Sequence, residues 1–233
     1  GCRSDDYRAF KAKLVDDWGQ KMILWSFRRC PYAMRARLAI ASAGVIVELR
    51  EIVLRNKPAA FIAASAKATV PVLVSSDQGV LQESRDIMFW ALNRNDPENW
   101  LAPWRADQAG VDAFFDHIDG PFKTHLDRYK YASRFDADAA IEHRAAGAKT
   151  LAMLDGMLAK QTNLSGENLA ILDFACLPFI RQFRIADEDW FDAQPWPHLH
   201  PWLQAFLASP RFAAVMHKYQ PWQDGDEAIT FPG

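Results

Sequence analysis

Cys30 is the residue of this sequence best placed to do chemistry. It follows a short apolar run, Met22–Phe27, and precedes Pro31, a residue that favours the first position of a helix. A thiol at the start of a helix faces unpaired backbone amides and the positive end of the helix dipole, which both favour the thiolate. Arg28 and Arg29 stand directly before Cys30 and add positive charge. The pattern predicts an activated, nucleophilic cysteine.

The predicted nucleophile has no second cysteine in its own motif. Ala33 occupies the position that the second cysteine of a Cys-x-x-Cys pair would take. A disulfide formed on Cys30 must therefore be released by an external thiol. The alternative interpretation is that Cys30 is a small buried residue at a tight corner.

The remaining metal-binding and thiol side chains form weaker patterns. His198 and His200 are spaced like a pair of metal ligands, but the sequence offers no third ligand for them. Cys176 lies among apolar residues and is typical of a core position. We therefore predict no metal site.

The elements that must position Cys30 alternate between strand and helix over residues 22–95. The patterns predict a strand at 22–27, a helix from Pro31 to Gly44, a strand at 45–53, a short helix at 58–64, a hairpin at 69–82 and a helix capped by Ser84. The order β-α-β-α-β-β-α is typical of a thioredoxin-like α/β domain.

The segments on either side carry helical patterns. Ser4–Trp18 predicts an amphipathic helix, so we expect residues 1–21 to form an N-terminal helical extension. Residues 96–106 are interpreted as a linker. Beyond it, apolar residues at helical spacing predict helices over 111–129, 141–158, 171–183, 199–207 and 210–218. We expect residues 107–233 to form an all-α domain.

Composition and charge narrow the class of protein. The chain has 233 residues, 50% of them hydrophobic and 24% charged, with a net charge of −2. The first hundred residues are basic on balance but lack a long Lys/Arg run, which suits a small anionic ligand better than nucleic acid. No apolar run approaches the roughly 18 residues of a membrane span. The N-terminal residues show no signal-peptide pattern, and the three cysteines form no disulfide motif, so we expect a cytoplasmic protein.

Four short segments, in this order and spacing, resemble the cytosolic glutathione S-transferases. They are Cys30-Pro31-Tyr32-Ala33, Asn56-Lys57-Pro58, Val70-Pro71-Val72-Leu73 and Glu83-Ser84. The Cys-Pro start and the segment Leu54–Pro58 are most similar to the omega, or cysteine-type, class. Residues 166–178 resemble the helical-domain segment of the family more loosely. The resemblance implies a thioredoxin-like domain followed by an all-α domain.

The resemblance also implies a glutathione site on the first domain. In the family, the residue before a cis-proline presents its backbone to the cysteinyl part of glutathione, a Glu-Ser pair holds the γ-glutamyl end, and a lysine faces the glycyl carboxylate. In this sequence these positions are Val70–Pro71, Glu83–Ser84 and Lys57, with Leu54 beside the lysine. Glutathione would act as co-substrate.

The sequence departs from the family at a few positions. Other classes activate glutathione with a hydroxyl, and Ser26 and Tyr32 are the candidates here, although Ser26 falls within the predicted strand and Tyr32 within the helix. Tyr32 also stands where omega proteins often carry Phe. Ala170 stands where the family usually places a Ser or Thr helix cap, a role that Asn168 could take.

The implied activity is a glutathione-dependent thiol transferase or reductase that works through a Cys30–glutathione mixed disulfide, dehydroascorbate reduction included. The alternatives are glutathione conjugation or reductive cleavage of an aromatic substrate, and a non-catalytic binding module with this fold. The acceptor would be a small electrophilic or disulfide compound. The acceptor pocket would be lined by Phe27, Tyr32, Tyr129, Tyr131 and Trp222. The family usually forms homodimers.

Cys30 should be the reactive thiol of the chain. Since the helix start, Arg28 and Arg29 all favour the thiolate, we expect the pKa of Cys30 to lie below the free-thiol value of about 8.5. The rate of alkylation by iodoacetamide as a function of pH measures this. An inflection at or above that value, or faster alkylation of Cys176, would contradict the prediction.

Overall fold

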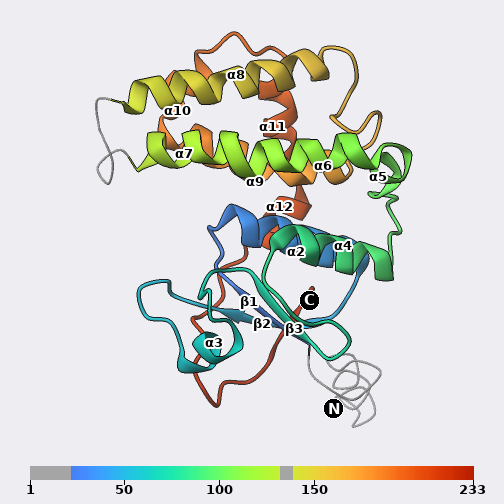
Figure 1. The fold of residues 1–233 in the computed structure, drawn as a ribbon, viewed down its shortest axis with the longest axis vertical. Helices are drawn as coiled ribbons and strands as arrows, with labels where there is room; N and C mark the ends of the chain where they lie inside the picture. Colours follow the sequence, from blue (N-terminus) through green and yellow to red (C-terminus); the bar gives the residue numbers. More distant parts are fainter. Residues whose placement is uncertain (1–21, 132–138) are drawn as a thin grey trace. The chain divides into compact units, whose positions relative to one another are not determined.

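A computed structural model describes residues 22–131 and 139–233. The predicted helix at Ser4–Trp18 lies outside the described residues. The chain divides into two compact units (Figure 1). Unit 1 comprises Gly1–Pro97 together with Ala214–Gly233, and unit 2 comprises Glu98–Ala213.

Unit 1 is built on a mixed five-stranded sheet. Its strands lie in the order β4-β3-β1-β2-β5, with β1 parallel to β2 and the other pairs antiparallel. The elements are β1 (Ile23–Ser26), α2 (Pro31–Ala43), β2 (Val47–Glu51), α3 (Ala59–Ala64), β3 (Val72–Ser75), β4 (Gly79–Leu81), α4 (Ser84–Arg94) and β5 (Ile229–Phe231). The predicted order of the first seven is confirmed, and it is that of a thioredoxin-like domain.

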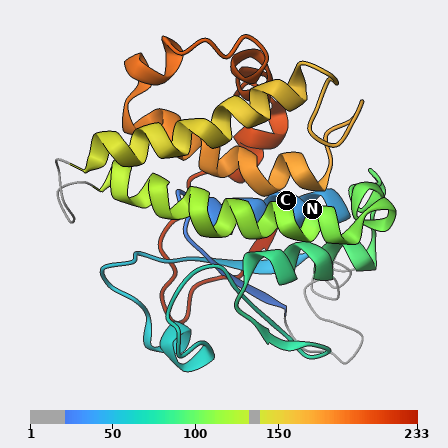
Figure 2. The same ribbon diagram turned by 45° about the horizontal axis from the view of Figure 1, so that its top comes forward.

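The helices of unit 1 cover both faces of the sheet. α2 and α4 pack together against one face, and α3 lies on the other (Figures 1 and 2). The central strand β1 is buried because it has neighbours on both sides and helices above and below. α2 ends at Gly44, whose φ of 64° is the left-handed conformation that glycine adopts without strain. This confirms the predicted end of the helix that begins beside Cys30.

The predicted cap of α4 is wrong. Glu83 occupies the N-cap position, and Ser84 is the first helical residue. The Ser84 hydroxyl is buried and accepts a hydrogen bond of 2.9 Å from Nε of Arg35, so it faces α2 instead of the amides of its own helix.

The C-terminal residues differ from the expected all-α domain over 107–233. Residues 214–233 belong to unit 1, and β5 extends the sheet by pairing antiparallel with β2. Phe231 at its end is buried opposite Val47. Three strand residues are too few to give a detectable period, and their partner lies far away in the sequence. β5 covers an edge of β2 that would otherwise expose unpaired backbone groups.

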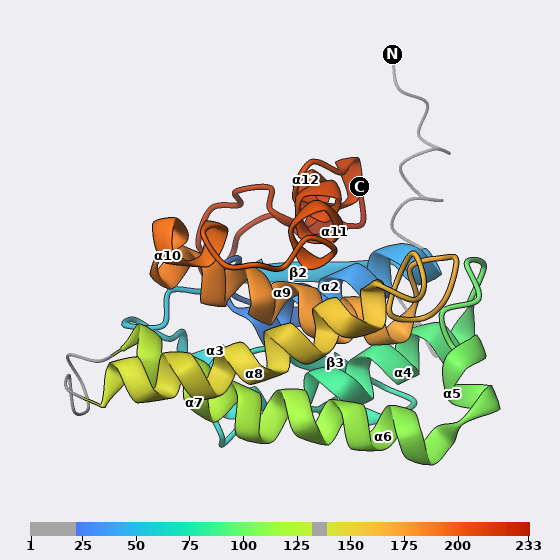
Figure 3. The ribbon, with the colours of Figure 1, turned by 90° about the horizontal axis from the view of Figure 1, so that it is seen from above.

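Unit 2 is helical, as expected. Its elements are α5 (Ala102–Ala106), α6 (Gln108–His117), the π-helical turn η1 (Ile118–Phe122), α7 (Lys123–Lys130), α8 (Ala140–Leu158), α9 (Ile171–Ala186), α10 (Glu188–Asp192) and α11 (Leu199–Leu207), while α12 (Pro210–Val215) crosses the boundary between the units. The single helix predicted over 111–129 is interrupted at η1, where Pro121 lacks a backbone N–H. Figure 3 shows α6 and α7 nearly in line, and α9, most of whose residues are buried, packs against both. No helix of the described residues is long and apolar enough to cross a membrane.

Asp173 supports the start of α9 from inside the helix. Its carboxylate accepts hydrogen bonds from the backbone N–H groups of Leu164, Ser165 and Ala170 and from the indole of Trp202. Ala170 has no side-chain oxygen to cap the helix, and the buried Asp173 carboxylate instead accepts bonds from the backbone at the helix start.

Asp173→Ala should destabilise the fold strongly. Four N–H donors lose their acceptor at once, so we expect the free energy of unfolding to fall by at least about 3 kcal/mol. Asp107→Ala is the matched control, because Asp107 is an exposed N-cap that accepts one bond, from Gly110, and its loss should cost about 1 kcal/mol. Equal losses in urea denaturation would contradict this account.

Candidate active site

Cys30 lies at the N-cap of α2, as predicted. Its backbone is extended, with φ −73° and ψ 124°, and Pro31 is the first helical residue. The Cys30 N–H donates to the carbonyl of Phe27 at 3.0 Å, which closes the turn between β1 and α2. The thiol is partly exposed and lies 3.7 Å from the backbone carbonyl of Val70. A thiol is thus held at the positive end of a helix, beside Val70, which lies two residues before β3.

The Val70–Pro71 peptide bond is cis, as the resemblance implied. Both residues are buried. Val70 belongs to a buried hydrophobic cluster, and Cys30, Phe27 and Trp222 pack against the same cluster. The Cys30 thiol and the backbone of Val70, the residue expected to pair with glutathione, are therefore direct neighbours.

Arg28 and Arg29 make contacts that the sequence did not predict. The Arg28 guanidinium reaches the carbonyl of Met216 at 3.4 Å, and the Arg28 backbone N–H donates to Oε1 of Glu51 at 2.6 Å. The Arg29 side chain is exposed, with its guanidinium 5.5 Å from the centre of the Phe27 ring. These contacts give both arginines a part in holding the loop before Cys30.

Arg37 is the residue of this region that sequence reasoning missed. It lies on α2 and is 1% exposed. Its guanidinium donates to the hydroxyl of Ser26 and to the carbonyls of Phe27 and Arg28, the latter at 2.8 Å. The Ser26 hydroxyl, considered above as an activator of glutathione, is thus buried and bonded to Arg37. An arginine in the apolar sequence Ala36–Ile40 was the available signal.

The charge of Arg37 belongs to a buried polar cluster. Burial lowers the pKa of Arg37 to about 10, while Glu51, the Cys30 thiolate and Tyr219 act in the opposite direction. Burial also raises the pKa of the Glu51 carboxyl, although the Arg28 N–H and Arg37 favour its charged form. Burial raises the pKa of Tyr219 as well, and the neighbouring Arg37 opposes that change. Two cations, a carboxyl and a phenol from four segments of unit 1 therefore meet beside the thiol.

The other predicted glutathione-binding residues have mixed surroundings. Leu54 and Lys57 are exposed in the loop after β2. Glu83 is exposed and pairs with Lys67 at 2.5 Å, whereas Ser84 is buried against Arg35. Arg35 also stacks on the predicted acceptor residue Tyr32, 5.1 Å from its ring centre.

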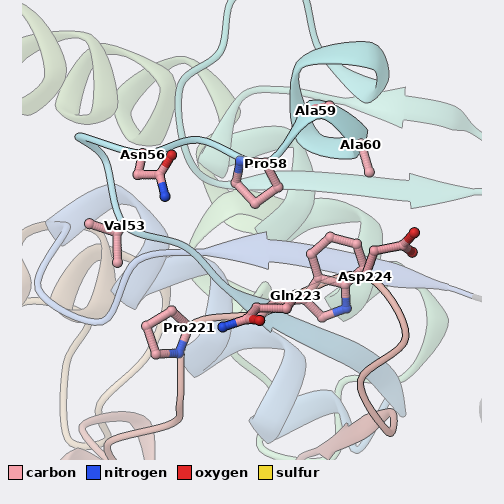
Figure 4. A pocket seen from close by; sticks show the side chains of 9 residues that line it. Val53, Asn56, Pro58, Ala59, Ala60, Pro221, Gln223 and Asp224 are labelled. Atoms are coloured by element: carbon pink, nitrogen blue, oxygen red, sulfur yellow. The ribbon is translucent and has the colours of Figure 1, made fainter.

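A pocket of about 770 Å³ opens in unit 1 between the C-terminal segment and the β2–α3 loop, which carries Lys57 between the lining residues Asn56 and Pro58 (Figure 4). Trp222 forms part of it, held by an edge contact of 5.0 Å to Trp25 and by Arg50, 4.4 Å from its ring. The backbone N–H of Trp222 donates to the backbone carbonyl of Glu51 at 2.8 Å, which fixes this part of the C-terminal segment to β2. The lining residues come from the β2–α3 loop, α3 and the C-terminal segment: Val53, Asn56, Pro58, Ala59, Ala60, Pro221, Trp222, Gln223 and Asp224.

The predicted acceptor residues are only partly brought together. Trp222 lines the pocket, and Phe27 packs against the same cluster as Trp222. Tyr129 and Tyr131 belong to unit 2, where Tyr129 packs on Phe183 with ring centres 5.0 Å apart. Within residues 22–131 and 139–233, no group of three or more potential metal ligands occurs.

Two family models match the chain in tandem. The glutathione S-transferase N-terminal domain matches residues 24–100, and the glutathione S-transferase C-terminal domain matches residues 103–205. The chain therefore belongs to the glutathione S-transferase family. Glutathione S-transferase omega-1 of Sus scrofa is 24% identical over 196 residues, which cover 82% of this chain and 79% of that protein. That relative is of the omega class, the class that the Cys-Pro motif resembles.

Solved structures share the fold. Glutathione transferase Omega 3C from Trametes versicolor has a TM-score of 0.71 at 18% identity, covering 92% of this chain and 96% of its own. A glutathione transferase family member from Pseudomonas fluorescens, solved with two glutathione molecules bound, has a TM-score of 0.73 at 16% identity, covering 89% of this chain and 97% of its own. These similarities agree with the thioredoxin-like and helical domains described above.

Glu51 makes the stability of unit 1 depend on pH. Because burial raises its folded-state pKa above the ordinary value of 4.5, the folded chain holds this proton more tightly than the unfolded chain. The free energy of unfolding contributed by Glu51 therefore falls as the pH rises from about 4.5 through the folded-state pKa. We expect Glu51→Gln to gain stability relative to the wild type over this rise. Urea denaturation of both proteins at several pH values measures the difference, and parallel curves would contradict it.

Proposed function

We propose that this protein is a glutathione-dependent thiol transferase of omega type, with Cys30 as its nucleophile. The single observation that carries the proposal is the Cys30 thiol at the N-cap of α2, beside the Val70 carbonyl that precedes a cis-proline. A helix start stabilises a thiolate, and a partly exposed thiolate can attack a disulfide. Membership of the glutathione S-transferase family supports glutathione as the second thiol.

The proposed cycle has two exchange steps. The Cys30 thiolate attacks the glutathione sulfur of a mixed disulfide between glutathione and a substrate thiol, and the substrate leaves as a thiolate that takes up a proton. A second glutathione, as its thiolate, then attacks the Cys30–glutathione disulfide. This step releases glutathione disulfide and returns the Cys30 thiolate. Overall, the substrate mixed disulfide and one free glutathione give the substrate thiol and glutathione disulfide, which contains the glutathionyl group of the substrate and the incoming glutathione.

Glutathione would lie across the loops that flank Cys30. We assign the cysteinyl backbone to Val70 and the glycyl carboxylate to Lys57, with Leu54 beside it. The γ-glutamyl end would approach Glu83 and Ser84 at the start of α4, where the helix dipole favours its carboxylate. The Glu83–Lys67 pair is exposed, so Glu83 can exchange this partner for the ammonium group of glutathione at little cost.

The acceptor is proposed to be a small oxidised molecule, such as a glutathionylated thiol or dehydroascorbate. The pocket beside Lys57 supports a compound with an apolar part, because Trp222, Pro58 and Pro221 line it. The amides of Asn56 and Gln223 at the same pocket offer hydrogen bonds. We propose Phe27 and Tyr32 as further contacts on unit 1.

Cys30→Ala should abolish the turnover of a glutathione mixed disulfide while leaving glutathione binding largely intact. The reason is that the assigned binding groups hold the peptide independently of the thiol. Cys30→Ser should also lose thiol transfer, since a serine hydroxyl is a far weaker nucleophile at neutral pH. Conjugation of glutathione to a chloroarene is the activity that serine could support instead.

The matched control is Cys176→Ala, because Cys176 is buried in α9 and its thiol donates to the carbonyl of Asp173. This variant should keep the wild-type turnover. The measurements are the thiol-transfer rate, the conjugation rate and glutathione binding by calorimetry. Equal thiol-transfer rates in the wild type and Cys30→Ser would exclude covalent catalysis by Cys30 and leave Tyr32 as the candidate, because the Ser26 hydroxyl is buried against Arg37.

A further inference from the structure

The buried guanidinium of Arg37 is bonded to the loop that carries Cys30. Arg37 lies seven residues after Cys30, two turns along the same helix, and its side chain extends back beneath the helix start. It donates to three successive residues, the Ser26 hydroxyl and the carbonyls of Phe27 and Arg28. Phe27 is the residue whose carbonyl accepts the Cys30 N–H. Arg37 and the Cys30 backbone N–H therefore donate to the same carbonyl, that of Phe27.

Glu51, at the end of β2, holds the same loop. The backbone N–H of Arg28 donates to Glu51, and the backbone carbonyl of Arg28 accepts a bond from Arg37. Each backbone group of Arg28 is therefore held by a different buried side chain. The two charges also interact with each other. This arrangement leaves the loop little freedom to move between the end of β1 and the start of α2.

We propose that Arg37 is the positioning residue of the active site, which fixes the Cys30 loop and supplies the buried cation that favours the Cys30 thiolate. The inference rests on the proposed function in so far as Cys30 is the nucleophile there. Arg28 and Arg29 were assigned this cationic role from their place in the sequence. Arg28 instead directs its guanidinium to Met216, and Arg29 is exposed to solvent, where its charge is screened.

An arginine suits both parts of this role. The planar guanidinium group carries several N–H donors that can bond to different oxygens at once, and it keeps its charge when buried. A buried charge also acts through a medium of lower dielectric than water, so its effect on a neighbouring thiol is larger than that of an exposed one. The other titratable groups that face Arg37 are Glu51 on β2, Tyr219 on the C-terminal segment and Arg28 on the loop.

α2 provides a matched control for Arg37. Arg35 lies on the same helix and is equally buried, at 1% exposed, but it donates to the Ser84 hydroxyl at the start of α4. Replacing Arg35 removes a buried guanidinium together with its bond to the start of α4. Comparing a substitution at Arg37 with the same substitution at Arg35 therefore separates an effect on the Cys30 thiol from the general effect of losing a buried arginine.

The test is the pH profile of Cys30 alkylation by iodoacetamide, followed by mass spectrometry of the Cys30 peptide, in the wild type, Arg37→Met and Arg35→Met. We expect the inflection of Arg37→Met to move to higher pH and its rate at pH 7 to fall several-fold. The rates should converge with the wild type above both inflections, where every thiol is ionised. Arg35→Met should keep the wild-type inflection. The assay needs no glutathione, so it can fail or succeed independently of the proposed substrate.

A wild-type inflection in Arg37→Met, or an equal shift in Arg35→Met, would overturn the inference. If Arg37→Met does not fold, as judged by thermal denaturation, Arg37→Lys provides the test. Lysine keeps the charge but has a single nitrogen, so it cannot hold three loop oxygens in the same geometry. We then expect kcat for thiol transfer to fall several-fold with KM for glutathione unchanged, and unchanged kcat in a folded Arg37→Lys protein would overturn the positioning role.

Discussion

The geometry around Cys30 depends on how Arg28 is held in the turn between β1 and α2. Its carbonyl accepts a hydrogen bond from one buried charge and its N–H donates to another. Neither charge would be tolerated alone at this depth, because an unpaired buried ion costs several kcal/mol. The opposite charges of Arg37 and Glu51 make the cluster possible, and the loop backbone satisfies part of their hydrogen-bonding capacity. The position of the thiol is thus coupled to the packing of α2 on β2.

The order of elements in unit 1 could be predicted from the sequence because its signals are local. Pro31 and Gly44 mark the two ends of α2, and the predicted hairpin turns at residues 76–78, between β3 and β4. These residues act through backbone preferences that hold in any context. The same local signals placed Cys30 at the helix start, which is the central feature of the site.

The features that escaped prediction depend on distant partners. In the sequence Arg37 looks like an ordinary helix residue and Ser84 like a helix cap, until the fold brings residues 26–28 and Arg35 against them. β5 has three residues and gains its structure only from β2. The pocket beside Lys57 combines the β2–α3 loop with residues 221–224, and only Trp222 of its aromatic and proline residues was anticipated. Pairing across more than a hundred residues leaves no periodicity within a short window.

The discontinuity of unit 1 has a consequence for its formation during synthesis. Residues up to 97 emerge from the ribosome first and contain four of the five strands, but β2 lacks its outer neighbour until residues 229–231 appear. The whole of unit 2 is translated in between. Domains generally fold as their residues emerge, so the nascent sheet must persist with an open edge while more than a hundred further residues are added. Translation rate and chaperone occupancy at that edge therefore bear on the yield of active protein, although neither touches the chemistry of the thiol.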